Sequence, residues 1–407
     1  MIKQQFEAPA KYKKWTYGLL AVGLVAFLAG FVFLGLSKDE HDQTRFWAGL
    51  LQNSLYFLMI CNACMFFICI NILGQSSWQT TFRRIPEAIA AIVPVFAVVS
   101  LIVFIAIVMG HQHHIYHWLD KEAVATDKIL SWKKGFLNPT FFFTWTVITL
   151  GVWILVGRKI KQLSLQTDKG EITGEEARKY IWNNTVWAGI FVVFFALTTG
   201  STIPWLWLMS IDAHWYSTMY SWYTFMSSFV GGLALIALFV IFLKNQGYLE
   251  HTTDEQLHDI GKYIFAFSIF WAYLWFSQFM LIWYANIPEE TIYFKPRLQG
   301  VYKGIFWFNF IINFIARILI LMTRGSKRNY AIMTFMSIAL VLGHWLDFYQ
   351  MVMPGAMGDD YSLGWYEWGM LAFFVGILMF FTGRALAKAP LVPVYHPYFK
   401  ESLIHHT

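Results

Sequence analysis

Long apolar segments recur from one end of this 407-residue chain to the other. A bilayer core of roughly 30 Å requires about 20 apolar residues in a helix, because each residue adds about 1.5 Å. Charged residues make up only 13% of the chain, against about 25% in a soluble domain. The sequence therefore predicts an all-α, polytopic membrane protein with ten transmembrane helices in a single membrane domain, residues 1–407. The expected helices cover residues 15–36, 46–73, 88–109, 137–157, 182–208, 218–243, 260–285, 304–323, 330–353 and 363–387.

The distribution of Lys and Arg predicts the orientation of these helices. With ten spans both termini lie on one side, where 20 Lys and Arg are expected, against 9 on the opposite side. Because basic residues are retained in the cytoplasm, both termini are predicted to be cytoplasmic. Cytoplasmic loops that face anionic lipid explain the net charge of +6 without a nucleic-acid partner. The loops are too short for a separate catalytic domain, so extramembrane catalysis would come from other subunits.

Few residues offer ligands for a cofactor. Cys61, Cys64 and Cys69 lie within one span, and without a second ligand pair they are expected to behave as small apolar residues. His344 is the only histidine well inside a span, whereas a membrane haem needs two axial ligands from facing helices. A histidine cluster follows the third span: His111, His113, His114 and His117. We interpret this cluster as a hydrated interfacial loop rather than a metal site, and we expect no metal and no redox cofactor on this chain.

Ionisable residues inside otherwise apolar spans are the strongest functional signal. A charged side chain near the bilayer centre costs roughly 2.5 to 3.5 kcal/mol on insertion scales, so it is rarely kept without a partner or a role. Asn309, Asn313 and Arg317 are spaced by four, which places them on one face of a helix. His344 and Asp347 are spaced by three and should also share a face, where they can share a hydrogen bond or a proton.

Helix rise places polar residues of three neighbouring spans at one depth. Gln278, Asn309 and His344 are expected at the same level, with Arg317 further inward and Asp347 further outward. Such a group suits a proton route or the head group of a polar ligand. A static network that fixes the helix packing explains the same residues equally well.

A second polar group is expected at the outer surface, between the fifth and sixth spans. Asp212 and His214 are two residues apart in a short loop after Pro204, where both could titrate. A surface pair without a special role is an equally good interpretation.

Three sequence blocks resemble a known family. The first is Ser-Ile-Asp-Ala-His-Trp-Tyr-Ser at residues 210–217, followed by Trp222 and Tyr223. The second starts with Leu-His-Asp at residues 257–259, which includes His258 and Asp259, and continues through residues 270–291. The third is Gly-His-Trp-Leu-Asp at residues 343–347, with Val-Met-Pro at 352–354. Together they resemble the ActF family, the smaller of the two NrfD-like membrane subunits of bacterial alternative complex III.

This resemblance implies a quinol:electron-acceptor oxidoreductase in the bacterial inner membrane. The implied partners are the larger NrfD-like subunit, periplasmic iron–sulfur and haem c subunits, membrane lipids and the quinone pool. The iron–sulfur clusters and haem c would belong to those other subunits, with quinol as the substrate. The implied architecture is two four-helix bundles, within residues 46–208 and 218–353, flanked by helices 15–36 and 363–387.

The resemblance also suggests roles for the polar residues. In the family the larger subunit is the better candidate for the quinol site, and the smaller one is a non-catalytic scaffold that can carry a proton route. The proton-route candidates are His344, Asp347, Arg317, Asn309, Asn313, Gln278, Asp212, His214, His258 and Asp259. A second quinone site, with His344, Asp347 and Gln278 near the head group, is the first alternative. A stand-alone secondary transporter is a more remote one.

Overall fold

The computed structural model describes residues 5–110, 112–358 and 363–406, and every regular element in these ranges is a helix. Ten helical spans are long and apolar enough to cross a membrane, which confirms the predicted multi-pass helical protein. The spans are formed by α1 with η1 (Ala10–Gly35), α2 (Glu40–Leu73), α3 and α4 (Arg84–Met109), α7 with η4 (Pro139–Asp168), α8 to α9 (Gly174–Trp207), α10 (Met219–Asn245), α11 (Asp254–Ala285), η7 to α15 (Gly300–Leu321), α17 (Tyr330–Met357) and α18 (Trp365–Leu386).

Several helices extend beyond the apolar segments that predicted them. α11 begins at Asp254 rather than at residue 260, because Thr253 caps its first turn together with Gln256. α17 continues past Pro354 to Met357, although the apolar segment was expected to end at residue 353. Apolarity marks only the part of a helix that lies within the bilayer, whereas capping groups set where the helix itself ends.

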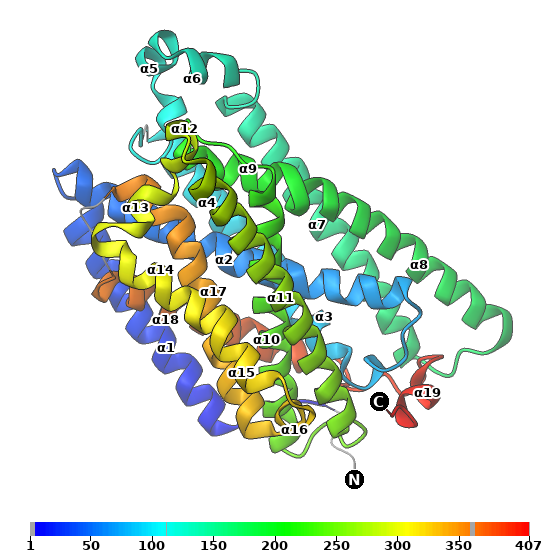
Figure 1. The fold of residues 1–407 in the computed structure, drawn as a ribbon. Helices are drawn as coiled ribbons and strands as arrows, with labels where there is room; N and C mark the ends of the chain where they lie inside the picture. Colours follow the sequence, from blue (N-terminus) through cyan, green and yellow to red (C-terminus); the bar gives the residue numbers. More distant parts are fainter. Residues whose placement is uncertain (1–4, 111, 359–362, 407) are drawn as a thin grey trace.

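Short helices lie at both ends of the bundle of spans. α5 (Lys121–Thr126), α6 (Lys128–Lys133) and α12 (Pro288–Thr291) lie at one end. α16 (Arg324–Arg328) and α19 (Phe399–Leu403) lie at the opposite end, together with both ends of the chain (Figure 1). There Gln5 Nε2 donates to the carbonyl oxygen of Ala387 at 2.7 Å.

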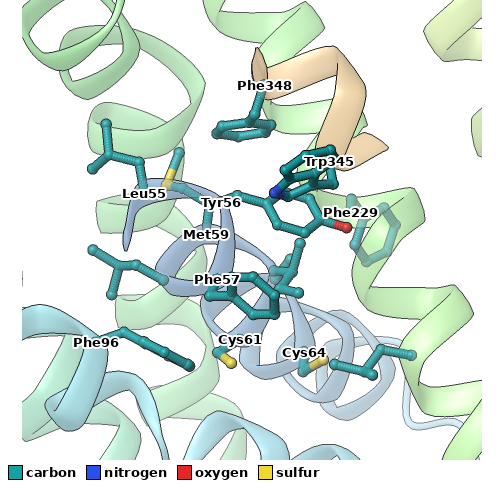
Figure 2. Close-up of a cluster of buried hydrophobic side chains, with 14 of the residues drawn as sticks. Leu55, Tyr56, Phe57, Met59, Cys61, Cys64, Phe96, Phe229, Trp345 and Phe348 are labelled. Carbon is teal, nitrogen blue, oxygen red and sulfur yellow. The ribbon is translucent and has the colours of Figure 1, made fainter. Parts of the chain in front are cut away.

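α2 and α10 form the centre of the molecule. Their most apolar stretches are 83% and 89% buried, whereas that of α1 is only 17% buried. α2 contacts α4, α8, α10 and α17, and side chains from α2, α4, α10 and α17 interlock around it (Figure 2). Gly232 of α10 permits this close approach, because a Cβ there would lie 3.1 Å from the carbonyl oxygen of Ile60. Cys61 and Cys64 point into this apolar core.

Three of the described spans are interrupted between two α-helical segments. The third is interrupted between α3 (Arg84–Ala90) and α4 (Val93–Met109). The fifth contains a π-helical segment, η5 (Thr198–Thr202), and the eighth contains another, η8 (Ile311–Ala316). A π-turn inside an α-helix is frequently found at a functional site, and η8 lies between Asn309 and Arg317.

Candidate functional site

A carboxyl group buried among four helices forms the centre of the site. Asp347 of α17 has no exposed surface. Its Oδ1 accepts hydrogen bonds from the Tyr223 hydroxyl of α10 and from Asn309 Nδ2 of α14 (Lys303–Phe310), the latter at 2.8 Å. Its Oδ2 accepts from Trp271 Nε1 of α11 at 2.9 Å. Side chains from three other helices therefore converge on one carboxyl group.

His344 lies beside this carboxyl group without a direct hydrogen bond to it. The distance from His344 Nδ1 to Asp347 Oδ2 is 3.8 Å, so the two residues share a face of α17 as the spacing predicted. The nearer partner of Nδ1 is Ser227 Oγ of α10, at 3.1 Å. His344 Nε2 is buried and has no hydrogen-bond partner among the described residues. The imidazole is thus hydrogen-bonded to Ser227 and lies next to Asp347.

On the eighth span, Asn309 and Asn313 are hydrogen-bonded to each other, as expected for polar residues spaced by four. Asn313 Nδ2 donates to Asn309 Oδ1 at 2.6 Å, and Asn309 in turn donates to Asp347. The segment that carries Asn313 is π-helical rather than α-helical, which corrects the regular geometry used in the prediction. A π-turn makes i→i+5 hydrogen bonds, and residues four apart still fall close to one face of it. Asn309, Asn313 and Arg317 accordingly all remain buried.

Arg317 is the least compensated group of the site. Its side chain has no exposed surface, and none of its three guanidinium nitrogens has a hydrogen-bond partner among the described residues. A buried charge without a partner is strongly destabilising. Static packing of this chain alone therefore gives no reason for an arginine at this position.

A small cavity continues the site beyond Asp347. It has a volume of about 20 Å³ and is lined by Tyr223, Asn309, Gln278, Gln350 and Arg297, among others. Gln278 Nε2 and Gln350 Oε1 have no hydrogen-bond partner among the described residues. A polar cavity of this size has room for one water molecule. Gln278 thus borders the site, as its expected depth implied, but donates no hydrogen bond to Asp347.

Arg297 also lines this cavity. It lies on α13 (Phe294–Leu298) and donates from Nε to the carbonyl oxygen of Gln350 at 2.9 Å, and from Nη2 to Asp212 Oδ2 at 3.1 Å. Its guanidinium carbon lies 3.4 Å from the centre of the Tyr293 ring. Burial lowers its pKa, but Tyr293 and Asp212 raise it by more, and the net shift is upward. Arg297 is therefore a fixed cation.

The two residues expected to act together near the outer surface have separate partners. Asp212 pairs with Arg297, whereas His214 Nε2 lies 2.6 Å from Asp127 Oδ2. Only Asp212 therefore reaches the cavity beside Asp347. The sequence spacing placed Asp212 and His214 in one loop but could not show that they have different neighbours.

His258 and Asp259 lie in another part of the molecule, near the start of α11. Asp259 forms ion pairs with Lys262 and with His405 of the C-terminal segment, both at 2.6 Å. His258 and Asp259 therefore lie at the end of the molecule that holds the chain termini. They take no part in the hydrogen bonds around Asp347.

The described residues contain no group of three or more His, Cys, Asp or Glu side chains that could hold a metal ion. In the histidine cluster, His114 Nε2 contacts Glu40 Oε2 at 2.9 Å, and both side chains are exposed. His111 lies outside the described residues.

Sequence analysis did not identify three direct contacts of the site: Tyr223, Trp271 and Ser227. Tyr223 and Trp271 occur in the blocks of the family resemblance, but aromatic residues make up 19% of the chain and do not stand out. Arg297 lies in a connection between two expected spans, where sequence analysis assigned it no role in the site. The requirement that a buried carboxylate receive several donors is the signal that could have directed attention to them.

Comparison with known proteins adds no family: no family model matches this chain, and no curated protein matches it.

Proposed function

We propose that this chain is a non-catalytic membrane subunit of a quinol:electron-acceptor oxidoreductase, similar to ActF, and that it carries a proton route. The observation that supports the route is a series of polar contacts. At its outer end the partly exposed Asp212 pairs with the fixed cation Arg297, which lines the water-sized cavity together with Tyr223 and Asn309. Tyr223 and Asn309 donate to the buried Asp347, and Asn313 donates to Asn309, so the series points along the eighth span toward Arg317. A carboxyl group and a phenol can exchange protons, and amide side chains and an ordered water can align the exchange. Arg317 supplies a fixed positive charge beside the inner half of the route.

The helix contacts support the proposed two-bundle architecture. α2, α4, α7 and α8 contact one another in the first half of the chain, and α10, α11, η8 and α17 do so in the second. α1 and α18 pair along the side of the molecule. We propose that these are the two four-helix bundles and the two flanking helices of the family.

The proposed assembly places the chain in the bacterial inner membrane with both termini in the cytoplasm. The larger NrfD-like subunit, with iron–sulfur and haem c subunits on the periplasmic side, would oxidise quinol and transfer the electrons. Asp212 and Arg297 would then face the periplasmic side, and Arg317 the cytoplasmic half of the membrane.

A quinone site at Asp347 is less well supported. The cavity beside Gln278 and Asn309 has a volume of about 20 Å³, which is too small for a quinone ring. A secondary transporter is also disfavoured. Such transporters have broken helices at corresponding positions of their two halves. Here η5 lies in the last span of the first bundle and η8 in the third span of the second, so the two interruptions do not correspond.

Replacement of Asp347 by Asn tests the proton route in the intact complex. The amide retains the shape of the side chain but cannot release a proton at neutral pH. We expect the complex to assemble and to bind quinol with an unchanged Michaelis constant, while proton translocation per electron falls on the order of tenfold. Glu289→Gln, an exposed acid-to-amide change, is the control. A raised Michaelis constant for quinol would instead favour a quinone site, and normal coupling would exclude Asp347 from any route.

Arg317→Leu tests whether the unpaired cation serves function rather than stability. Removal of a buried, unpaired charge should leave the subunit as stable or more stable, by about 1 kcal/mol or more. Proton translocation should nevertheless fall. Thermal unfolding of the purified subunit and proton stoichiometry of the complex measure the two effects separately. Loss of the subunit from the membrane would show that Arg317 has an essential partner in the assembly and a structural role.

A further inference from the structure

A larger cavity lies in the other half of the molecule, away from Asp347. It has a volume of about 290 Å³ and is formed by α2, α3, α4 and α7. Its buried wall includes Asn62, Met65 and Trp153, while its open side includes Arg158 and Lys161, which are exposed and half-buried. The cavity thus has an apolar body and a cationic edge near the end of α7.

The cationic edge is not neutralised by the nearby carboxylate. Glu87 also lines the cavity, but it already accepts from Arg83 Nε and Arg84 Nη1, both at 2.9 Å. Arg158 and Lys161 form no hydrogen bond or ion pair with any described residue. Glu87 interacts electrostatically with Lys161, but neither cation has a carboxylate in hydrogen-bonding contact among the described residues.

Asn62 supplies an independent indication of a ligand. This residue is 1% exposed, lies on the cavity wall, and its Nδ2 has no hydrogen-bond partner among the described residues. A purely hydrocarbon occupant would leave this buried donor unsatisfied. The occupant therefore needs a hydrogen-bond acceptor as well as an apolar chain and a negative charge.

We propose that this cavity binds one anionic glycerophospholipid, with its phosphate at Arg158 and Lys161. An acyl chain lies against Met65, Trp153 and the neighbouring apolar wall, and an ester carbonyl accepts from Asn62 Nδ2. A glycerophospholipid combines all three features, and basic pockets between membrane helices are recognised sites for anionic head groups. The site does not depend on the proposed respiratory function.

Native mass spectrometry of the full chain tests this proposal. The protein would be equilibrated with mixed micelles that contain phosphatidylglycerol and phosphatidylethanolamine, and the affinity for each lipid measured. We expect preferential retention of a single phosphatidylglycerol. Each of the changes Arg158→Gln and Lys161→Gln should weaken its binding by about fivefold, and Asn62→Leu by a few-fold.

A change that fills the cavity distinguishes specific lipid binding in the cavity from general attraction of lipid to basic residues. Ala91→Phe places a ring in the apolar body of the cavity without a change of charge, and it should also weaken phosphatidylglycerol binding. The control is Arg178→Gln with Lys179→Gln, two exposed cations on α8 outside the cavity lining, which should have no effect.

Three results would overturn the proposal. Equal retention of phosphatidylethanolamine would exclude a site for anionic lipid. Full competition by inorganic phosphate would indicate a soluble anion site that does not use the apolar cavity. A co-purified quinone whose binding is lost in Asn62→Leu but unchanged in Arg158→Gln would assign the cavity to a different ligand.

Discussion

At the scale of single residues, the candidate site depends on a glycine as much as on its ionisable groups. Gly343 of α17 faces η8, and a Cβ there would lie 2.2 Å from Asn313 Oδ1 and 2.9 Å from Ile312 Cγ2. The missing side chain thus provides the space in which Asn313 reaches Asn309. In the sequence, Gly343 was part of a motif, but its physical role was not apparent.

Gly343→Ala should displace the Asn313 side chain and break its hydrogen bond to Asn309. We expect a loss of about 1 to 3 kcal/mol in the free energy of unfolding, because the added methyl group overpacks a buried contact. Thermal or denaturant unfolding of the purified subunit measures the change. Gly304→Ala is the matched control, since no atom lies within 4 Å of a Cβ at that position. In the double variant Gly343→Ala with Asn313→Ala, the loss in free energy of unfolding should be smaller than the sum of the losses in the two single variants. A loss equal to that sum would contradict the proposed clash.

At the scale of elements, the C-terminal segment after α18 is fastened to the start of α3. His396 is 6% exposed, and its Nε2 lies 3.0 Å from Arg83 Nη1. A guanidinium can only donate, so the imidazole must accept and be neutral. Burial, followed by the charges of Arg83 and Arg84, lowers the pKa of His396 well below its ordinary value of 6.5. The contact is therefore sensitive to acid.

The attachment of this segment should weaken as the pH falls below about 6.5. In that range the released segment binds a proton on His396 and the attached segment does not, so acid favours release. The free energy of attachment should fall by at most about 1.4 kcal/mol per pH unit, until the lowered pKa is reached. Hydrogen exchange of residues 392–403 between pH 7 and pH 5 measures it. His396→Gln keeps a neutral acceptor and should flatten the pH dependence, whereas His406→Gln, an exposed control, should leave it intact. An equally steep dependence in His396→Gln would assign it to another group.

At the scale of the whole molecule, the fold places both chain ends at one end of the helical bundle (Figure 1). The charge distribution predicts that this end is cytoplasmic. α5 and α6, at the other end, would then face the periplasm, and the turn between α7 and α8 would face the cytoplasm.

Single cysteines at Lys121 and Glu176 test this orientation. Both residues are exposed, and they lie at opposite ends of the spans: Lys121 is the first residue of α5, and Glu176 is in the first turn of α8. An impermeant maleimide applied to intact cells from which the outer membrane has been removed should label Lys121→Cys. Glu176→Cys should react only after lysis. Cys61, Cys64 and Cys69 are buried and should not react in the folded protein. If only Glu176→Cys were labelled in unbroken cells, the result would contradict the proposed topology and indicate the opposite orientation.

The sequence by itself determined the class of the fold. Apolar length alone identifies the spans, since a helix is the way a single segment satisfies its backbone groups in lipid. It also identified His344, Asp347 and Arg317, because an ionisable residue is conspicuous in an apolar span. Local spacing on one helix was sufficient to place Asn309 and Asn313 on one face.

Only the tertiary structure decided which residues surround these groups. Tyr223 and Trp271 are far from Asp347 in sequence, and nothing in a local pattern shows which aromatic hydroxyl or indole will reach a given carboxyl group. The same holds for Arg297, which the sequence counts as a loop charge but which the fold buries beside Asp212. Hydrophobic periodicity specifies how each helix turns its faces, whereas the partners across helices depend on packing between segments that are distant along the chain.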